Sequence, residues 1–319
     1  MNGSPPACSV IVPAYKTTAY IAETLESIFA QTFQNFEIIV ANDGCPDTEN
    51  LERVLAPYRH RIVYLKQQNG GLGAARNLAI RASQAPVIAL LDSDDLFEPD
   101  YLATQLAVLA ANPQVDVACC DATYFGDKTM EGKLFSQVCL SNGEINFANV
   151  VHERVHVFVA VTARTAVFEK AGLFFPLREI QGSDDYSMWL KLTLQGKLFH
   201  YTDKPLVRYR RHRTSLSAND IGMIHSNLAA LKAVRAWAPS LTPEQGQVFD
   251  EHHQHLIGKL GLYQAKQDLR DGNYESAKAN LMVAVAHYDS SLRMKIIAQL
   301  TKVAPGLMRA VLIAGDSRR

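Results

Sequence analysis

Short apolar runs alternate with longer amphipathic segments along the first part of the chain. The runs with strand character are 9–12, 37–41, 62–65, 87–91 and 115–120. Between the first two runs, Ile21, Leu25 and Ile28 recur at helical spacing. Glu23 and Glu26 fall on the opposite side, which we expect to face water. This alternation predicts βαβ units that build a mostly parallel sheet flanked by helices.

The remainder of the chain divides into an irregular half and a helical part. From about residue 125 to 217 no single period dominates, although 185–195 has a helical pattern. After Asp220 no strand-like run follows. We therefore predict one α/β domain over 1–217 and an all-helical C-terminal extension over 218–319. The helical segments of the extension are 223–238, 244–270 and 274–288.

Composition narrows the class of protein. The 32 Lys and Arg residues balance 32 Asp and Glu residues, so no net charge attracts nucleic acid. The five cysteines form no CxxC pair, which indicates buried reduced thiols rather than a disulfide framework. We find no signal-peptide pattern and no apolar segment long enough to span a bilayer. A cytoplasmic protein is expected.

An acidic cluster, Asp92-Ser93-Asp94-Asp95, ends the apolar run 87–91. Carboxylates this close repel one another beside an apolar strand unless a cation neutralises them. Carboxylate and phosphate oxygens suit Mg²⁺, and Mn²⁺ accepts similar ligands. For Asp95 an alternative is a helix N-terminus ahead of Pro99. The loops that follow parallel strands meet at one sheet edge, where ligands bind.

Two polar loops are expected at the same edge. Asn42-Asp43-Gly44 follows the second strand, and the glycine-rich loop 70–77 opens a helix. This second loop would bring backbone amides and Arg76 near a phosphate. Taken alone, Asn42-Asp43-Gly44 also reads as an ordinary turn. Loop 70–77 does not complete GxGxxG and follows the third strand, which argues against a dehydrogenase.

The irregular half holds two further polar clusters. Asp184 and Asp185 open a helical run, so each is either a helix cap or a catalytic carboxylate. The segment 209–213 concentrates three arginines and a histidine, which would contact a diphosphate and a metal. A solvated basic strand end is the alternative for this segment.

In this order, the motifs resemble those of the family 2 glycosyltransferases of the GT-A fold. The resemblance covers about residues 8 to 217 and depends on the order and spacing of the motifs. It implies a Rossmann-like sheet in which 8–124 binds a nucleotide-sugar and 125–217 receives the acceptor. The matching segments are 10–15, 31–33, 36–40, 42–44, 71–77, 92–95, 184–185, 209–210 and His212.

The resemblance implies how a donor is held. A uridine-type nucleotide would lie between the opening strand and Asp43, with Pro13 and Tyr15 lining the base pocket. Arg76 would lie near the nucleotide and diphosphate, and Asp92 near the ribose. A UDP-sugar is therefore the expected donor.

The resemblance also implies a metal site for Mn²⁺ or Mg²⁺. Asp94 and Asp92 would form the acidic part of this site. His212 resembles a third ligand, which comes from the closing segment of the domain, residues 209–213. Arg211 or Arg213 would help to neutralise the leaving diphosphate.

Asp185 occupies the place of the family's catalytic base, while Asp184 stands where glutamate is common. The implied reaction is a single displacement with inversion, in which the base takes a proton from an acceptor hydroxyl. The expected acceptor is a saccharide or a lipid-linked molecule of glycan synthesis.

Two other classes of function compete with this hypothesis. A nucleotidyltransferase would need a phosphate-binding loop after the first strand, where 13–16 contains no glycine. A helical scaffold would agree with 272–277, which resembles the turn of a tetratricopeptide repeat. Only one such unit is recognisable, and repeat proteins need about three.

The end of the chain suggests a location. Basic residues accompany an apolar face there, which predicts a peripheral contact with anionic lipid. Pro305 interrupts the pattern, so a packed helical cap is the alternative. The residues concerned are Arg293, Lys295, Lys302, Arg309, Arg318 and Arg319, with Leu292, Ile296, Ile297, Leu300 and Leu312.

Overall fold

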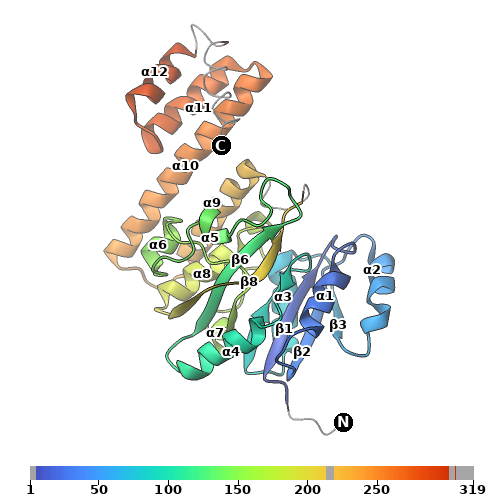
Figure 1. Cartoon of the computed structure of the whole chain (residues 1–319). Helices are drawn as coiled ribbons and strands as arrows, with labels where there is room; N and C mark the ends of the chain where they lie inside the picture. The colour runs from blue at the N-terminus through green and yellow to red at the C-terminus, as the bar shows by residue number, and fades with distance from the viewer. Residues whose placement is uncertain (1–4, 213–218, 302–305, 307–319) are drawn as a thin grey trace. The chain divides into compact units, whose positions relative to one another are not determined.

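A computed structural model describes residues 5–212, 219–301 and 306 of the chain. The chain forms two compact units, Met1–Ser215 and Leu216–Arg319 (Figure 1). Residues named above that lie outside the described residues are Arg213, Lys302, Pro305, Arg309, Leu312, Arg318 and Arg319, and the side chain of Arg293 is likewise not described.

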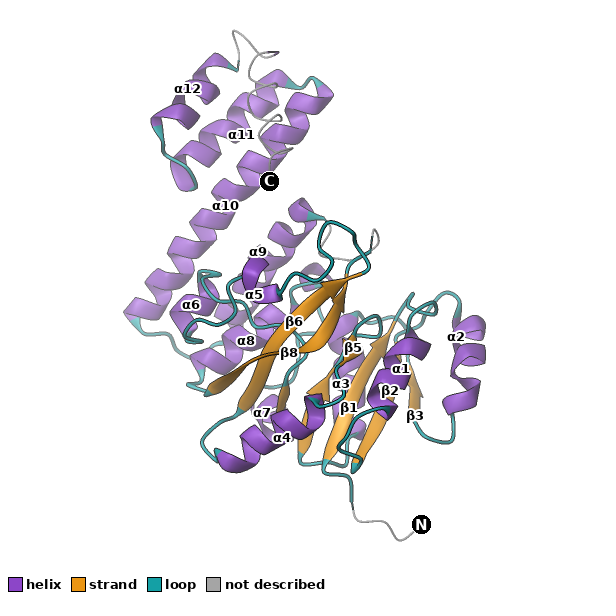
Figure 2. Cartoon of the chain, viewed as in Figure 1, coloured by secondary structure: helices purple, strands orange, loops and turns teal. Residues whose placement is uncertain are grey.

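The first unit is built on an eight-stranded mixed sheet, counted over its described residues. The strand order is β3-β2-β1-β4-β7-β6-β8-β5, with helices on both faces (Figure 2). The strands are β1 Cys8–Ala14, β2 Phe36–Asn42, β3 Val63–Lys66, β4 Val87–Leu90, β5 Leu96–Phe97, β6 Val117–Phe125, β7 Thr162–Arg164 and β8 Phe199–Arg210. The helices are α1 Ile21–Phe29, α2 Thr48–Leu55, α3 Leu72–Ala82, α4 Tyr101–Ala111, α5 Phe135–Val138, α6 Phe147–Val151, α7 Thr165–Lys170 and α8 Asp184–Leu194.

The side-chain alternation of the strands explains the core on one face of the sheet. Val10, Val12 and Val40 pack with Ile21 and Leu25 of α1 in one buried cluster, which also takes in side chains of α2 and α4. The helical spacing in 21–28 is what presents these side chains together, as predicted.

Strand directions confirm the predicted mostly parallel α/β sheet. β1 runs parallel to both β2 and β4, and β2 runs parallel to β3. β8 of the irregular half pairs with β6 in a long parallel pair whose register shifts around Asp121. β7 runs antiparallel to β4 and β6, and β5 antiparallel to β8. The short strands β5 and β7 were not predicted, since two or three residues carry no period.

The second unit is helical, as expected. Its described helices are α9 Asp220–Trp237, α10 Pro243–Asp271, α11 Tyr274–His287 and α12 Leu292–Leu300. Thr242 and Gln245 form a capping box at the start of α10, and Gly272 ends this helix with φ +81°. Gly258 allows α11 to approach α10, because a Cβ there would lie 2.6 Å from the Tyr288 backbone nitrogen. Among the described residues, no helix has the length and apolarity needed to cross a membrane.

Candidate active site

The acidic loop follows β4 at the carboxyl edge of the parallel strands. Its turn is closed by the Asp95 N–H, which donates to the Asp92 carbonyl at 3.1 Å. The Ser93 hydroxyl donates to Thr17 Oγ1 at 2.8 Å and ties the loop to the end of β1. The sequence therefore brings Asp92 and Asp94 to the edge where ligands of such sheets bind.

Asp95 is the buried member of the loop. Its carboxylate accepts the backbone N–H of Arg210 at 2.8 Å. Burial and the charges of Asp94 and Asp92 raise its pKa well above the usual value. The alternative that Asp95 caps a helix is wrong, because α4 begins at Tyr101 and Asp100 occupies its N-cap position.

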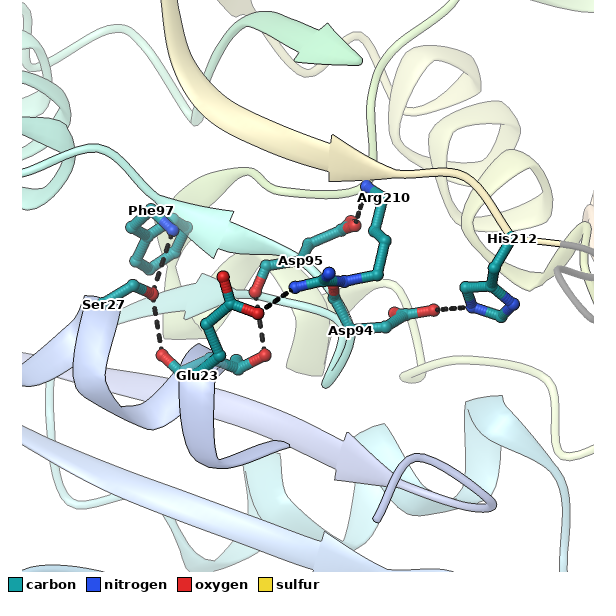
Figure 3. A network of polar contacts seen from close by, with 8 residues as sticks. Glu23, Ser27, Asp94, Asp95, Phe97, Arg210 and His212 are labelled. Atoms are coloured by element: carbon teal, nitrogen blue, oxygen red, sulfur yellow. Dashed lines mark hydrogen bonds and ion pairs between the residues drawn. The ribbon is translucent and has the colours of Figure 1, made fainter. Parts of the chain in front are cut away.

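Asp94 and His212 face each other from opposite sides of the site. His212 Nε2 lies 3.0 Å from Asp94 Oδ2 (Figure 3). The imidazole also stacks on the Tyr20 ring, with the ring centroids 5.1 Å apart. Burial and the Asp92 charge raise the pKa of Asp94, against the opposing effect of His212. Asp94 lies in the loop after β4 and His212 just after β8, and 118 positions of sequence separate the two residues.

A carboxylate suits both Mg²⁺ and Mn²⁺, whereas an imidazole is a ligand for transition metals, so the pair fits Mn²⁺ better than Mg²⁺. Within the described parts of the chain, no three His, Cys, Asp or Glu side chains are arranged around one metal position. Two protein ligands fit a cation that takes the rest of its shell from phosphate oxygens and water.

Arg76 is buried between two carboxylates. It forms ion pairs with Asp92, at 2.6 Å from Nη2 to Oδ1, and with Asp184. Its side chain is 1% exposed, whereas that of Asp92 is 28% exposed. Burial acts to lower the pKa of Arg76, but the charges of Asp184 and Asp92 outweigh it and raise this pKa. In this arrangement Arg76 links the acidic loop to α8 and is itself covered.

The two aspartates at the start of α8 have different surroundings. Asp184 is buried and forms an ion pair with Arg76. Asp185 is half-buried, and its Oδ1 accepts the Tyr186 N–H at 2.7 Å. Burial and the Asp184 charge raise the pKa of Asp185 to about 7, and Arg76 opposes this rise. The helix-cap alternative is wrong for both, since Ser183 occupies the N-cap position and no side chain caps the helix.

The residues expected to bind the donor lie at the ends of β1 and β2. Pro13 is buried within β1, and Tyr15 follows this strand half-buried. Asp43 follows β2, and its carboxylate accepts the N–H groups of Gly70 at 2.8 Å and Gly71 at 2.9 Å. The glycine-rich loop thus gives these two amides to Asp43, contrary to the expectation that they approach a phosphate.

The arginines of the basic segment at the end of β8 make different contacts. The backbone N–H of Arg211 donates to the Phe125 carbonyl at 2.9 Å, and its guanidinium lies 6.0 Å from the Tyr209 ring centroid. Arg210 instead turns to Glu23 of α1, with which it forms an ion pair. No sequence pattern indicated this pair, because Glu23 lies 187 residues away on a helix face that was expected to face water.

The acidic loop after β4 lies within the part of the chain that matches a known protein family. Residues 9–171, just over half of the chain, match the family described as glycosyl transferase family 2. The chain belongs to glycosyl transferase family 2. The predicted family is thereby confirmed.

Relatives of this family 2 protein include EpsH of Bacillus subtilis, which carries a glycosyltransferase name. It is 34% identical over 218 residues, which are 66% of this chain and 62% of EpsH. The glycosyltransferase GlyA of Streptococcus pneumoniae is 26% identical over 322 residues, which cover 97% of this chain and 44% of GlyA. The chain thus spans less than two thirds of the length of both relatives.

Solved structures identify the fold as that of the GT-A glycosyltransferases. TarS of S. aureus, solved with UDP-GlcNAc, aligns with a TM-score of 0.62 at 15% identity, over 98% of this chain and 91% of that one. The mannosyltransferase PcManGT of Pyrobaculum calidifontis, solved with GDP-Man and Mn²⁺, aligns with a TM-score of 0.58 at 20% identity, over 99% and 87%. The predicted GT-A fold class is confirmed.

Proposed function

We propose that this protein transfers a sugar from a UDP-sugar to an acceptor hydroxyl with inversion, with Mn²⁺ or Mg²⁺ as cofactor. The observation that carries the proposal is the place of Asp185, which lies half-buried at the start of α8 next to the Arg76–Asp184 ion pair. Its pKa of about 7 suits a general base at neutral pH, and Arg76 and Asp184 connect it to the acidic loop.

In the proposed reaction, Asp185 accepts the proton of the acceptor hydroxyl while this oxygen attacks the anomeric carbon. The bond from that carbon to the diphosphate oxygen breaks in the same step, so the configuration inverts. Asp184 does not take this role, because its carboxylate neutralises buried Arg76. Arg76 in turn is assigned to holding Asp92 and Asp184 in place rather than to contact with the diphosphate.

Asp94 and His212 would hold the cation, with Asp92 nearby on the same loop. The cation, when bound, neutralises the charge that grows on the leaving diphosphate. Arg211 is the cationic side chain of the described closing segment that we assign to the same diphosphate. Pro13, Tyr15 and Asp43, at the ends of β1 and β2, are assigned to the nucleotide.

The solved neighbours support a nucleotide-sugar donor in general, since their structures contain UDP, UDP-GlcNAc or GDP-Man. The preference for uridine comes from the motif resemblance. A panel of UDP- and GDP-sugars, incubated with the protein, Mn²⁺ and candidate saccharides, tests the proposal by the nucleoside diphosphate released. Release of pyrophosphate would instead indicate a nucleotidyltransferase, and no turnover of any donor would favour a scaffold.

We also propose that the protein works in the cytoplasm at the inner face of the membrane, on a saccharide or lipid-linked acceptor. Leu292, Ile296 and Leu300 are 74%, 48% and 39% exposed on one side of α12, and Lys295 is exposed beside them. Met294 and Ile297 on the other side are buried against the helical core. An apolar stripe with a lysine beside it suits the surface of an anionic bilayer.

A further inference from the structure

Arg210, the last residue of β8, joins three parts of the first unit. Its backbone N–H donates to Asp95 Oδ1 at 2.8 Å, and its Nε donates to the Asp94 carbonyl oxygen at 2.8 Å. Its Nη2 forms an ion pair with Glu23 of α1, as Figure 3 shows. One residue therefore connects the closing segment, the acidic loop and the first helix.

The guanidinium of Arg210 is directed inward. It lies 4.2 Å from the Phe125 ring centroid and 4.8 Å from that of Tyr20, and the side chain is 13% exposed. Tyr20 also stacks on His212. With Nε and Nη2 already donating to protein oxygens, this group is engaged by the fold and is not presented to a diphosphate.

We propose that Arg210 is a positioning residue that holds the Asp94 carboxylate and the His212 imidazole opposite each other for a divalent cation. The inference rests on the proposed function, because it takes this pair as the cation site. Arg210 fixes the main chain at Asp94 through the carbonyl oxygen. It also fixes the strand end two residues before His212.

The 3.0 Å approach of the two ligands thus depends on one side chain. A cation that meets ligands already in place loses less free energy to ordering them. The planar guanidinium donates in two fixed directions at once, which a lysine cannot reproduce.

The test measures Mn²⁺ binding to the full chain in the presence of saturating UDP. Electron paramagnetic resonance monitors the binding. Arg210→Met should weaken Mn²⁺ binding about tenfold or more, as loss of an outer support of metal ligands does. The affinity for UDP at saturating Mn²⁺ should not change, and kcat at saturating Mn²⁺ should stay within about threefold of the wild type, since Arg210 does not touch the reacting atoms. Arg210→Lys should restore part of the Mn²⁺ affinity through its charge opposite Glu23.

Arg208→Met is the matched control. Arg208 lies on the same strand, is exposed and faces the same Phe125 ring at 4.5 Å. Its removal costs a ring contact without loosening the acidic loop, so Mn²⁺ affinity should stay at the wild-type level. Equal Mn²⁺ affinity in Arg210→Met and Arg208→Met would overturn the inference. Loss of UDP affinity at saturating Mn²⁺ would also overturn it, since Arg210 would then bind the diphosphate.

If Arg210→Met does not fold, Mn²⁺ binding to the Glu23→Gln variant tests the inference. This exposed substitution on α1 keeps a hydrogen-bond acceptor and removes one charge of a partly exposed pair, so Mn²⁺ binding should weaken about threefold. Unchanged Mn²⁺ binding would contradict the inference. A wild-type protein that binds no Mn²⁺ in the presence of UDP would contradict the proposed function itself. Wild-type Mn²⁺ binding that is insensitive to Arg210 would contradict this inference alone.

Discussion

Replacing Asp185 with asparagine removes a proton acceptor while it preserves shape and hydrogen bonding. The pKa of about 7 means that most Asp185 side chains are ionised at pH 8. Positioned general bases contribute about 10²–10⁴ to a rate. We expect Asp185→Asn to lower transfer by about this factor with UDP-sugar affinity nearly unchanged. Initial rates and donor titrations at pH 8 measure both quantities.

The pH dependence gives a second readout. In the wild type, kcat/KM should rise as Asp185 loses its proton, with an apparent pKa near 7. The residual activity of Asp185→Asn should lack this rise. A rise of the same size in both proteins would assign the titration to another group.

The Asp185 carboxylate should lower the free energy of unfolding at neutral and alkaline pH. Its pKa is raised on folding from 3.8 to about 7, so the folded chain binds the proton more tightly than the unfolded chain. Stability therefore falls as pH rises between these two values and stays lower above them. The shift sets an upper bound of about 4 kcal/mol. We expect Asp185→Asn to gain about 1–2 kcal/mol at pH 8, because the side chain keeps some contact with water.

Asp184→Asn is the contrasting variant. It leaves buried Arg76 with one carboxylate partner instead of two, and breaking a buried pair costs about 3–5 kcal/mol. We expect a lower melting temperature and a smaller loss of transfer than in Asp185→Asn. The reverse ranking of transfer rates would make Asp184 the base, and near-normal rates in both variants would remove the base from this segment.

Two further predictions concern the cation and the membrane. UDP should raise the melting temperature with Mn²⁺ and not with chelator, and Asp94→Ala should abolish this difference; equal stabilisation in both conditions would refute the metal assignment. The intact chain should float with anionic liposomes and much less with neutral ones, while serine at Leu292, Ile296 and Leu300 should abolish flotation. Serine at Val138, Leu140 and Leu177, which are similarly exposed in the first unit, is the matched control and should leave flotation unchanged. Equal flotation of the two triple variants would rule out α12 as the membrane contact. If the wild type does not float and the α12 variant changes its oligomeric state, the stripe is a protein interface instead.

The strands of the nucleotide-side half were predictable because their β-branched runs alternate with helical spacing. The bounds shifted where polar residues continue a strand, as in β6, which starts at Val117 and extends to Phe125 rather than ending at 120. β8 escaped prediction because its sequence includes Asp203, Lys204 and Pro205, all exposed. Its pairing with β6 tolerates them through a shift in register at Asp121.

The candidate site was predictable as a set of positions at one sheet edge, but not as a set of contacts. Asp94, Asp185 and His212 follow motifs whose order is visible in the sequence. The partners of Arg76 and Arg210 are not visible, because an ion pair between residues 108 or 187 positions apart depends on packing that no local period encodes. Both arginines were expected at the diphosphate, and both instead bind carboxylates of the protein.

Arg76 and Asp184 together decide how basic Asp185 can be. The Asp184 charge raises the pKa of Asp185 and the Arg76 charge lowers it, so the ion pair keeps the net effect small and burial supplies most of the rise. Without Arg76, the Asp184 charge would raise the pKa of Asp185 further, and fewer Asp185 side chains would be ionised at neutral pH. With Arg76 but without Asp184, it would ionise more readily and would accept a proton less strongly. A buried ion pair next to a half-buried carboxylate is therefore a way to keep the proposed base near neutral pH, and this role accounts for a covered arginine in the site that we propose for a nucleotide-sugar.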